Sequence, residues 1–358
     1  MCTDCDHSSD RYGCNATAPT FLFASPYSAA GIQSIKFLFL LFVFLSNSFF
    51  VIKATSAQDF CDRCEIYEVS TRHLGCCLMP LAENRHSLEV CKLQSNGDWA
   101  ASNIETIAND RGADKDRVTI FYIHGNWMTR ENARSRTEFL CRLIQCQTTI
   151  PFRIVMLSWP SQRERHPVQD IKENADCTNV QAFHLAWLLS RMPADEPVSI
   201  MGFSFGGRVV TGAMHLIAGG QISSLGLNDF AGEEIYSPDQ LRKYRVSLAA
   251  PALDRSWISP GKQHGKAMES IDRLVNLYNS KDPVLRRFRF VDFARPTAAG
   301  FTGFQNTGDP RQTMPLASQD RVAQFDCGSQ LGSTHDEKSY YTKCPCFKRA
   351  VKNLFSEE

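Results

Sequence analysis

The sequence has no excess of charge of either sign, and this argues against one broad class of function. Its 358 residues include 39 lysines and arginines and 38 aspartates and glutamates, a formal net charge of +1. A protein that binds nucleic acid normally carries a marked basic excess. We therefore expect no nucleic-acid partner, and we interpret the short basic cluster at residues 286–289 as a solvated surface.

The sequence also lacks a long uninterrupted apolar run. A helix that spans a bilayer needs about 20 apolar residues, whereas the most apolar stretch, residues 37–52, is shorter and contains polar residues. It follows Lys36 and precedes the small residues Thr55-Ser56-Ala57, as the core of a secretory signal does. The stretch of sequence that precedes this apolar run is unusually long for a signal peptide. We predict that residues 1–57 form a leader, either a signal peptide removed on export or a signal-anchor that associates with the membrane.

Cysteine, by contrast, is abundant, and 14 cysteines favour an exported, periplasmic or extracellular protein. Cleavage would remove three of them (Cys2, Cys5 and Cys14) and leave eleven, so at least one would stay unpaired within the chain. A zinc site close to His73 is one interpretation of the cysteines that follow the leader, but a clean second C-x-x-C pair is missing. Two disulfides that pin the first strands are favoured, and no metal or cofactor is expected. The cysteines that follow the leader are Cys61, Cys64, Cys76, Cys77 and Cys91.

The pattern along the chain changes near residue 117. Residues 58–117 are a Cys-rich lead-in, whereas in residues 118–358 short apolar runs alternate with helix-like stretches. This alternation predicts an α/β fold with a mainly parallel central sheet and helices on both faces. Two polar stretches, 219–243 and 284–320, are candidates for a lid or for pocket walls. The predicted strands are 66–71, 88–93, 118–123, 152–157, 198–202, 244–248, 274–277 and 322–325, and the predicted helices are 130–145, 179–189 and 205–218.

The pentapeptide GFSFG at residues 202–206 matches the pattern G-x-S-x-G, which alone is common. Here it follows an apolar run and opens a helix-like stretch, which is the strand–turn–helix of a nucleophile elbow. Such a turn holds its serine in a strained conformation at a helix N-terminus, where developing negative charge is favoured. Ser204 is therefore the predicted nucleophile. The alternative is a serine that caps the helix, with glycines present for close packing.

A second motif, His124-Gly125-Asn126, follows the predicted strand 118–123. In a nucleophile-elbow fold one oxyanion-hole amide lies in this loop, and the other belongs to the residue after the nucleophile. We predict Phe205 and Asn126 as the two donors, with Trp127 as the alternative to Asn126. His124 is expected to brace the loop.

An attacking serine needs a base and an acid that orients the base, and in this fold they follow the serine in the order acid, then histidine. Three histidines come after Ser204. His215 lies in the predicted helix of the elbow, and His264 comes before the most suitable acid. His335, in a polar loop after the last predicted strand, is therefore the predicted base.

Two aspartates are candidates for the acid. Asp282 precedes Pro283 directly after the predicted strand 274–277, which is where the acid is expected. Its alternative role is to start an Asx-turn, as aspartate before proline often does. Asp254, after the preceding strand, is the second choice.

The segments that carry these residues resemble the α/β-hydrolase superfamily, and in particular a bacterial group of such proteins without assigned substrates. The resemblance extends over residues 118–354 and implies a parallel-sheet core, a Ser-Asp-His triad and hydrolysis of an ester or related acyl bond. At matching positions it points to Ser204, Asp282 and His335. The segments are HGN at 124–126, SWPS at 158–161, GFSFGG at 202–207, LAAPALD at 248–254, NSKDPVL at 279–285 and THDEKSYY at 334–341.

The predicted function is that of a serine hydrolase that cleaves a small or lipid-like carboxylic ester through an acyl-enzyme. The alternatives are an amidase, peptidase or acyltransferase with the same triad, and an exported binding protein that keeps the fold without turnover. Four apolar residues flank the predicted catalytic segments and suit an acyl pocket or the core equally well. They are Trp127, Met128, Phe203 and Phe205.

Overall fold

The computed structural model describes residues 64–76, 88–109, 117–163, 167–222, 225, 242–290, 296–305 and 321–356. The predicted leader 1–57, with its apolar segment 37–52, lies outside these ranges, as do Cys61 and Cys77. Much of the two polar stretches at 219–243 and 284–320 also lies outside them. No helix within these ranges is both long enough and apolar enough to cross a bilayer.

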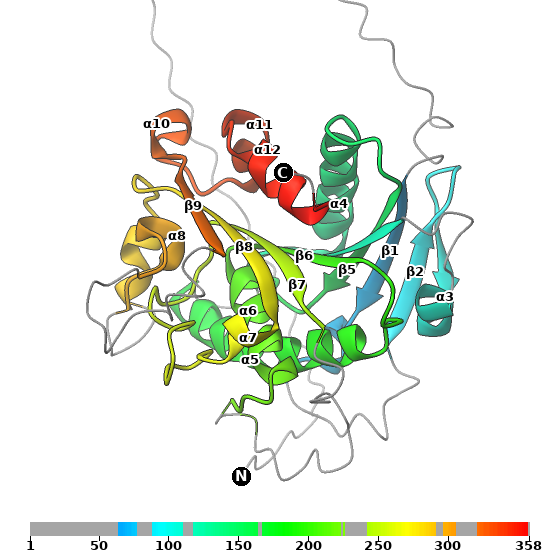
Figure 1. Ribbon diagram of the computed structural model, residues 1–358, viewed down its shortest axis with the longest axis horizontal. Coiled ribbons are helices and arrows are strands. Elements are labelled where there is room, and N and C mark those ends of the chain that lie inside the picture. The colour runs from blue at the N-terminus through cyan, green and yellow to red at the C-terminus, as the bar shows by residue number, and fades with distance from the viewer. Residues whose placement is uncertain are drawn as a thin grey trace, which may run out of the picture. The chain divides into compact units, whose positions relative to one another are not determined.

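In the described part of the chain, nine strands form one sheet in the order β3-β2-β1-β5-β4-β6-β7-β8-β9 (Figure 1). The neighbours from β1 to β9 run parallel, and β2 and β3 add an antiparallel edge. This confirms the predicted mainly parallel sheet of an α/β-hydrolase fold. The strands are β1 (Cys64–Ser70), β2 (Glu89–Leu93), β3 (Trp99–Ser102), β4 (Val118–Ile123), β5 (Phe152–Ser158), β6 (Val198–Phe203), β7 (Tyr244–Ala249), β8 (Ile271–Tyr278) and β9 (Val322–Asp326).

All eight predicted strands form, and β3 is the strand that the prediction missed. Strands β4, β5 and β6 are buried along their whole length, because helices cover both faces of the sheet there. Their sequences are therefore nearly continuous apolar runs and easy to find. Strand β3 has only four residues, two of them alanines, and none is fully buried. Its alanines have little β-propensity, so its sequence has no strand pattern.

Helices cover both faces of the sheet, with α4, α11 and α12 on one face and α5, α6 and α7 on the other (Figure 1). Helix α5 begins twelve residues before the predicted stretch 179–189, because its first turns are too polar to show helical periodicity. The helices are α3 (Ile104–Asn109), α4 (Arg130–Gln145), α5 (Pro167–Ser190), α6 (Phe205–Ile217), α7 (Ala267–Ser270), α8 (Ala299–Thr302), α10 (Gly328–Leu331), α11 (Glu337–Lys343) and α12 (Phe347–Leu354), with 3-10 turns η1 (Arg72–Leu74) and η5 (Leu285–Phe290).

Two disulfides join the lead-in to helices on opposite faces of the sheet. Cys64 of β1 pairs with Cys141 of α4, and Cys76 pairs with Cys177 of α5. These lead-in cysteines are therefore bonded to later parts of the chain. Within the described ranges, no cluster of histidine, cysteine or carboxylate side chains could hold a metal ion. A third disulfide joins Cys327 to Cys344, and the free cysteines of these ranges are Cys91, Cys146 and Cys346.

Candidate active site

Ser204 occupies a tight turn between β6 and α6. Its φ is 51°, in the left-handed region that non-glycine residues rarely adopt, and its amide donates to the Ala249 carbonyl at 3.0 Å. The turn requires glycine at position 206, since a Cβ there would lie 2.1 Å from the Ile123 carbonyl oxygen. The strained turn thus places Ser204 at the carboxyl edge of the parallel sheet.

His335 lies between Ser204 and Asp282. Its Nε2 is 3.0 Å from Ser204 Oγ, and its Nδ1 is 2.6 Å from Asp282 Oδ2. A carboxylate can only accept, so Nδ1 carries the proton and donates to Asp282. Nε2 is then free to accept the Ser204 hydroxyl proton. The structure brings together these three residues from loops that are separated by up to 131 positions.

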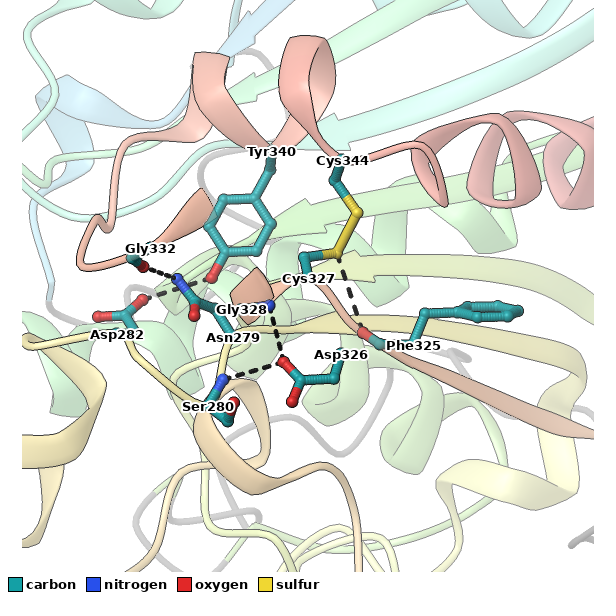
Figure 2. Close-up of a disulfide and its surroundings, with 10 residues drawn as sticks. All are labelled: Asn279, Ser280, Asp282, Phe325, Asp326, Cys327, Gly328, Gly332, Tyr340 and Cys344. Atoms are coloured by element: carbon teal, nitrogen blue, oxygen red, sulfur yellow. Dashed lines mark hydrogen bonds between the residues drawn. A yellow bond between two sulfur atoms is a disulfide. The ribbon is translucent and has the colours of Figure 1, made fainter. Parts of the chain in front are cut away.

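Asp282 is fully buried and accepts several hydrogen bonds. Its Oδ1 accepts from the backbone amides of Val284 at 2.9 Å and Leu285 at 3.0 Å. Its Oδ2 also accepts from the Tyr340 hydroxyl at 3.4 Å (Figure 2). The aspartate therefore starts the turn after β8 and orients His335 with the same carboxylate, so the two interpretations of Asp282 are compatible.

Burial and the Asp282 carboxylate raise the pKa of Tyr340 far above its ordinary value, so its hydroxyl keeps its proton and remains a donor. Sequence reasoning missed Tyr340, although it lies five residues after His335. Tyr340 lies in helix α11, which places its hydroxyl beside Asp282. The sequence contains no recognisable pattern for this contact.

The other candidate acid and base residues have different partners. Asp254 joins its own loop to a later segment, since its carboxylate accepts from the backbone amides of Ser256 at 2.8 Å and Thr297 at 3.0 Å. His215 accepts from a backbone amide at 3.0 Å, and His264 bonds a threonine of α6 at 2.8 Å. Among the described residues, the geometry therefore favours Asp282 over Asp254.

The loop that carries His335 is closed by a disulfide. Cys327 follows β9 and pairs with Cys344 at the end of α11, with His335 between them (Figure 2). Both cysteines are buried. The disulfide therefore links covalently the two ends of the segment that presents the base.

Two side chains also tie this loop to the strand ends beside it. Asn279, after β8, donates to the carbonyls of Gly332 at 3.0 Å and Thr334 at 3.1 Å. Asp326, at the end of β9, accepts from the Gly328 amide at 2.8 Å, and Figure 2 shows both side chains beside the disulfide. Asp326 also accepts from the Ser280 amide at 3.2 Å, so the loop after β8 and the loop after β9 are joined by two side chains.

The loop after β4 approaches Ser204 closely. A Cβ at Gly125 would lie 3.2 Å from Ser204 Cβ, so the backbone of this loop faces the serine. Phe205 is the first residue of α6, where backbone amides have no partner within the helix. The Asn126 side chain accepts a hydrogen bond from Asn174 at 2.8 Å. Both predicted donors, Phe205 and Asn126, therefore lie in segments that border Ser204.

His124 is fully buried, as expected for a residue that braces this loop. Its ring stacks on Trp159 with 5.5 Å between centroids and 8° between planes. The Trp159 indole N–H donates to the His124 carbonyl at 3.0 Å. Burial, with a smaller effect of Arg72, lowers the pKa of His124 to about 3, so the imidazole is neutral at physiological pH.

The apolar residues near the site divide into two groups. Phe203 and Phe205 are 7% and 4% exposed, and the Phe203 ring lies 5.2 Å from the His335 ring between centroids. Both form part of the core, and Phe203 packs against His335. Trp127, on the loop after β4, is 42% exposed with a φ of 56°, and the Arg163 guanidinium lies 5.6 Å from its ring centroid.

A family model described as "Alpha/beta hydrolase of unknown function (DUF900)" matches residues 100–285, more than half of the chain. The chain belongs to this family. The match includes β4 to β8, the elbow and Asp282, whereas the lead-in strand β1 and the His335 loop lie beyond it.

No curated protein matches this alpha/beta hydrolase family member. Among solved structures, it is similar to acyl-protein thioesterase 2 from Zea mays, with 14% identity, a TM-score of 0.31 and coverage of 66% of this chain and 94% of that chain. It is also similar to esterase B from Lactobacillus rhamnosis, with 9% identity, a TM-score of 0.37 and coverage of 82% and 84%. A predicted CIB-like hydrolase from Thermoplasma acidophilum has 14% identity, a TM-score of 0.30 and coverage of 75% and 92%.

Proposed function

We propose that this family member is a serine hydrolase that cleaves a carboxylic ester or related acyl bond. The observation that carries the proposal is the hydrogen-bonded series from Ser204 Oγ through His335 to Asp282, with distances of 3.0 Å and 2.6 Å. This is the arrangement that a serine hydroxyl needs in order to attack a carbonyl carbon at neutral pH.

In the first half of the reaction, His335 Nε2 accepts the hydroxyl proton while Ser204 Oγ bonds to the carbonyl carbon. Asp282 stabilises the imidazolium through Nδ1–H. The amides of Phe205 and Asn126 donate to the developing oxyanion, with an expected contribution of about 3–4 kcal/mol per donor. His335 then protonates the leaving alcohol, and an acyl-Ser204 intermediate forms.

In the second half, His335 accepts a proton from water, and the resulting hydroxide attacks the acyl-enzyme. The tetrahedral intermediate collapses with return of the proton to Ser204, and the carboxylic acid leaves. The exposed Trp127 ring supplies an apolar surface for the acyl or alcohol part of a small-molecule or lipid-like ester. This chemistry requires no metal or organic cofactor.

A fluorophosphonate probe tests the proposal directly, because it phosphonylates only an activated serine. The full chain is expected to be labelled and to hydrolyse p-nitrophenyl esters, and Ser204→Ala should lose both activities. The matched control is Ser256→Ala, a serine in the Asp254 loop. Folded wild-type protein that neither reacts with the probe nor turns over an ester would exclude the proposal and favour a binding protein. Labelling with hydrolysis of amides alone would indicate the amidase or peptidase alternative.

We also propose that the protein is exported, either released after cleavage of its leader or anchored by it. The three disulfides support an oxidising compartment. Cell fractionation followed by N-terminal sequencing of the mature protein tests this proposal. Recovery of the intact chain in the cytosol with reduced cysteines would contradict it.

A further inference from the structure

Arg72 belongs to the lead-in, outside the residues that the family model matches, yet it lies at the edge of the sheet that carries the site. Strand β1 runs parallel to β5 with Ser70 opposite Ser158, and the Thr71 amide donates to the Ser158 carbonyl at 3.0 Å. The chain therefore leaves β1 at the same edge as the ends of β5 and β4. The turn η1 that follows begins with Arg72.

The Arg72 guanidinium reaches across β5 to the imidazole of the oxyanion loop. Its Nε donates to Ser158 Oγ at 2.8 Å, and its Nη2 lies 3.3 Å from His124 Nε2. A second N–H, the backbone amide of Trp159, is directed at the same ring nitrogen at 3.2 Å. Neither donor can accept a hydrogen bond, so Nε2 must be the unprotonated nitrogen of a neutral ring.

This fixes the proton of His124 on the opposite nitrogen. His124 Nδ1 lies 2.9 Å from the Gly125 carbonyl oxygen, which can only accept, so Nδ1–H donates to it. The Gly125 carbonyl and the Asn126 N–H belong to one planar peptide unit and point in opposite directions. A bond that fixes the carbonyl therefore also fixes the direction of the Asn126 N–H, on the loop that borders Ser204.

We propose that Arg72 is a positioning residue of the acyl-transfer site, which orients the Asn126 amide through the tautomer and ring position of His124. The inference rests on the proposed serine hydrolase function, because it assigns to Asn126 the role of an oxyanion donor. The lead-in, which the Cys76–Cys177 disulfide holds to α5, thus contributes a positioning residue to the site at the carboxyl edge of the sheet.

The arginine is suited to this role by its charge. Burial lowers the pKa of Arg72 to about 10, so the guanidinium remains charged at neutral pH. A charged donor makes a stronger hydrogen bond to a neutral acceptor than an uncharged one does. The planar guanidinium also directs one N–H at Ser158 and another at His124, whereas the single ammonium of lysine cannot reproduce both hydrogen bonds.

The test compares Arg72→Met and Arg72→Lys with wild type in the full chain, with Arg142→Met, a 61% exposed arginine of α4, as the matched control. For ester turnover we expect kcat to fall about tenfold in Arg72→Met, with KM changed by less than about twofold, because the donor acts mainly on the transition state. The kcat of Arg72→Lys should lie between those of Arg72→Met and wild type. Equal kcat in Arg72→Met and Arg142→Met, or a loss confined to KM, would overturn the proposal.

A second measurement is independent of activity and of stability. In protein labelled with 15N-histidine, assigned with His124→Gln, the wild-type His124 ring should show protonated Nδ1 and unprotonated Nε2. The Nε2 resonance should shift in Arg72→Met and stay in place in Arg142→Met. A wild-type ring protonated on Nε2 would exclude the proposed arrangement even if the enzyme is active. The expected ring state in a protein without any ester turnover would instead point to failure of the proposed function alone.

Discussion

The predicted base side and the predicted oxyanion side of the site are held in place by different means. On the base side, His335 lies in a segment closed by the Cys327–Cys344 disulfide, whose cysteines are only 17 positions apart. On the oxyanion side, the loop at His124 is held by hydrogen bonds and ring stacking, and Arg72 comes from 52 positions away. The first side thus has a local covalent link in addition to its hydrogen bonds, whereas the direct contacts at His124 are non-covalent.

This difference indicates which perturbations should affect which half of the reaction. A local covalent link keeps its loop in place even when neighbouring contacts weaken, but a reductant can break it. The hydrogen bonds at His124 are not themselves reducible, but they depend on the protonation state of this histidine. The two sides should therefore fail under different conditions, and variants can separate them.

The largest expected effect is on the base side, from Asp282→Asn. The amide cannot hold the productive His335 tautomer, and kcat for an ester should fall by about four orders of magnitude. The matched variant Asp254→Asn should retain nearly wild-type kcat, because the Asp254 carboxylate accepts from the amides of Ser256 and Thr297 and not from His335. Steady-state kinetics of both variants is the measurement. A large loss in Asp254→Asn with an active Asp282→Asn would reverse the assignment of the acid.

The next largest effect is expected from removal of the Cys327–Cys344 disulfide by the double change Cys327→Ser and Cys344→Ser. Closing a loop of this size stabilises a protein by about 3 kcal/mol in the chain-entropy treatment. We expect kcat to fall by about tenfold or more even at temperatures where the variant is fully folded, because the histidine loop is released.

The control for this experiment is removal of the Cys64–Cys141 disulfide, which closes a longer loop of 77 positions. It should lower the free energy of unfolding at least as much but leave kcat unchanged, because Cys64 is the first residue of β1, at the edge of the sheet opposite to the one that carries Ser204. Urea unfolding and kinetics at one temperature separate the two effects. Equal kcat losses in the two double variants would show that the disulfides act through global stability alone.

Another effect, on the predicted oxyanion side, is a loss of folding stability in acid. The pKa of His124 is about 3 in the folded protein against 6.5 in an unfolded chain. Between these values only the unfolded chain binds the proton, so the stabilisation is complete above about pH 6.5 and is lost as the pH falls toward 3. The free energy of unfolding should change by up to about 1.4 kcal/mol per pH unit in this window.

Urea unfolding between pH 4 and 7 measures this slope, and His124→Gln should make it shallower. His184, another buried histidine with a pKa lowered to about 4, contributes in the same direction and serves as the comparison through His184→Gln. Only the His124 variant should also lose kcat. An unchanged pH slope in His124→Gln would mean that this ring is already protonated or exposed.

The smallest effect is expected from Tyr340→Phe. It removes the longest of the hydrogen bonds to Asp282, at 3.4 Å, and leaves the two backbone donors in place. We expect kcat to fall about threefold, which corresponds to a weak hydrogen bond. Tyr341→Phe is the control, since its hydroxyl donates to the buried Glu337 and should affect stability alone. A larger kcat loss in Tyr341→Phe than in Tyr340→Phe would contradict this role.

The sequence was sufficient to predict the elements whose determinants are local. Strand β6, the elbow and α6 are consecutive, so the buried run, the glycines and Ser204 appear together in the sequence. Asp282 before Pro283 and His335 in the loop after β9 could likewise be proposed from their immediate sequence neighbours. Strand β3 and the first half of α5 escaped prediction because their own residues show too little periodicity and the surrounding structure stabilises them.

The roles of Arg72, Asn279 and Tyr340 could not be predicted. Each has an ordinary sequence environment, and each acquires its role only through a partner 52 to 58 positions away. The cysteine pairs are of the same kind. The number of cysteines predicts disulfides in an oxidising environment, but the partners depend on which helix packs on which strand.

The sequence by itself determined the fold class, the order of the predicted serine, acid and histidine, and the exclusion of a strongly basic surface. These follow from side-chain periodicity and from turn chemistry, which act within a few residues. Only the tertiary structure decided that Asp282 rather than Asp254 faces His335, and that the lead-in residue Arg72 lies beside His124. Both depend on how the parallel strands are ordered and aligned, since their carboxyl ends bring distant segments to one edge of the sheet.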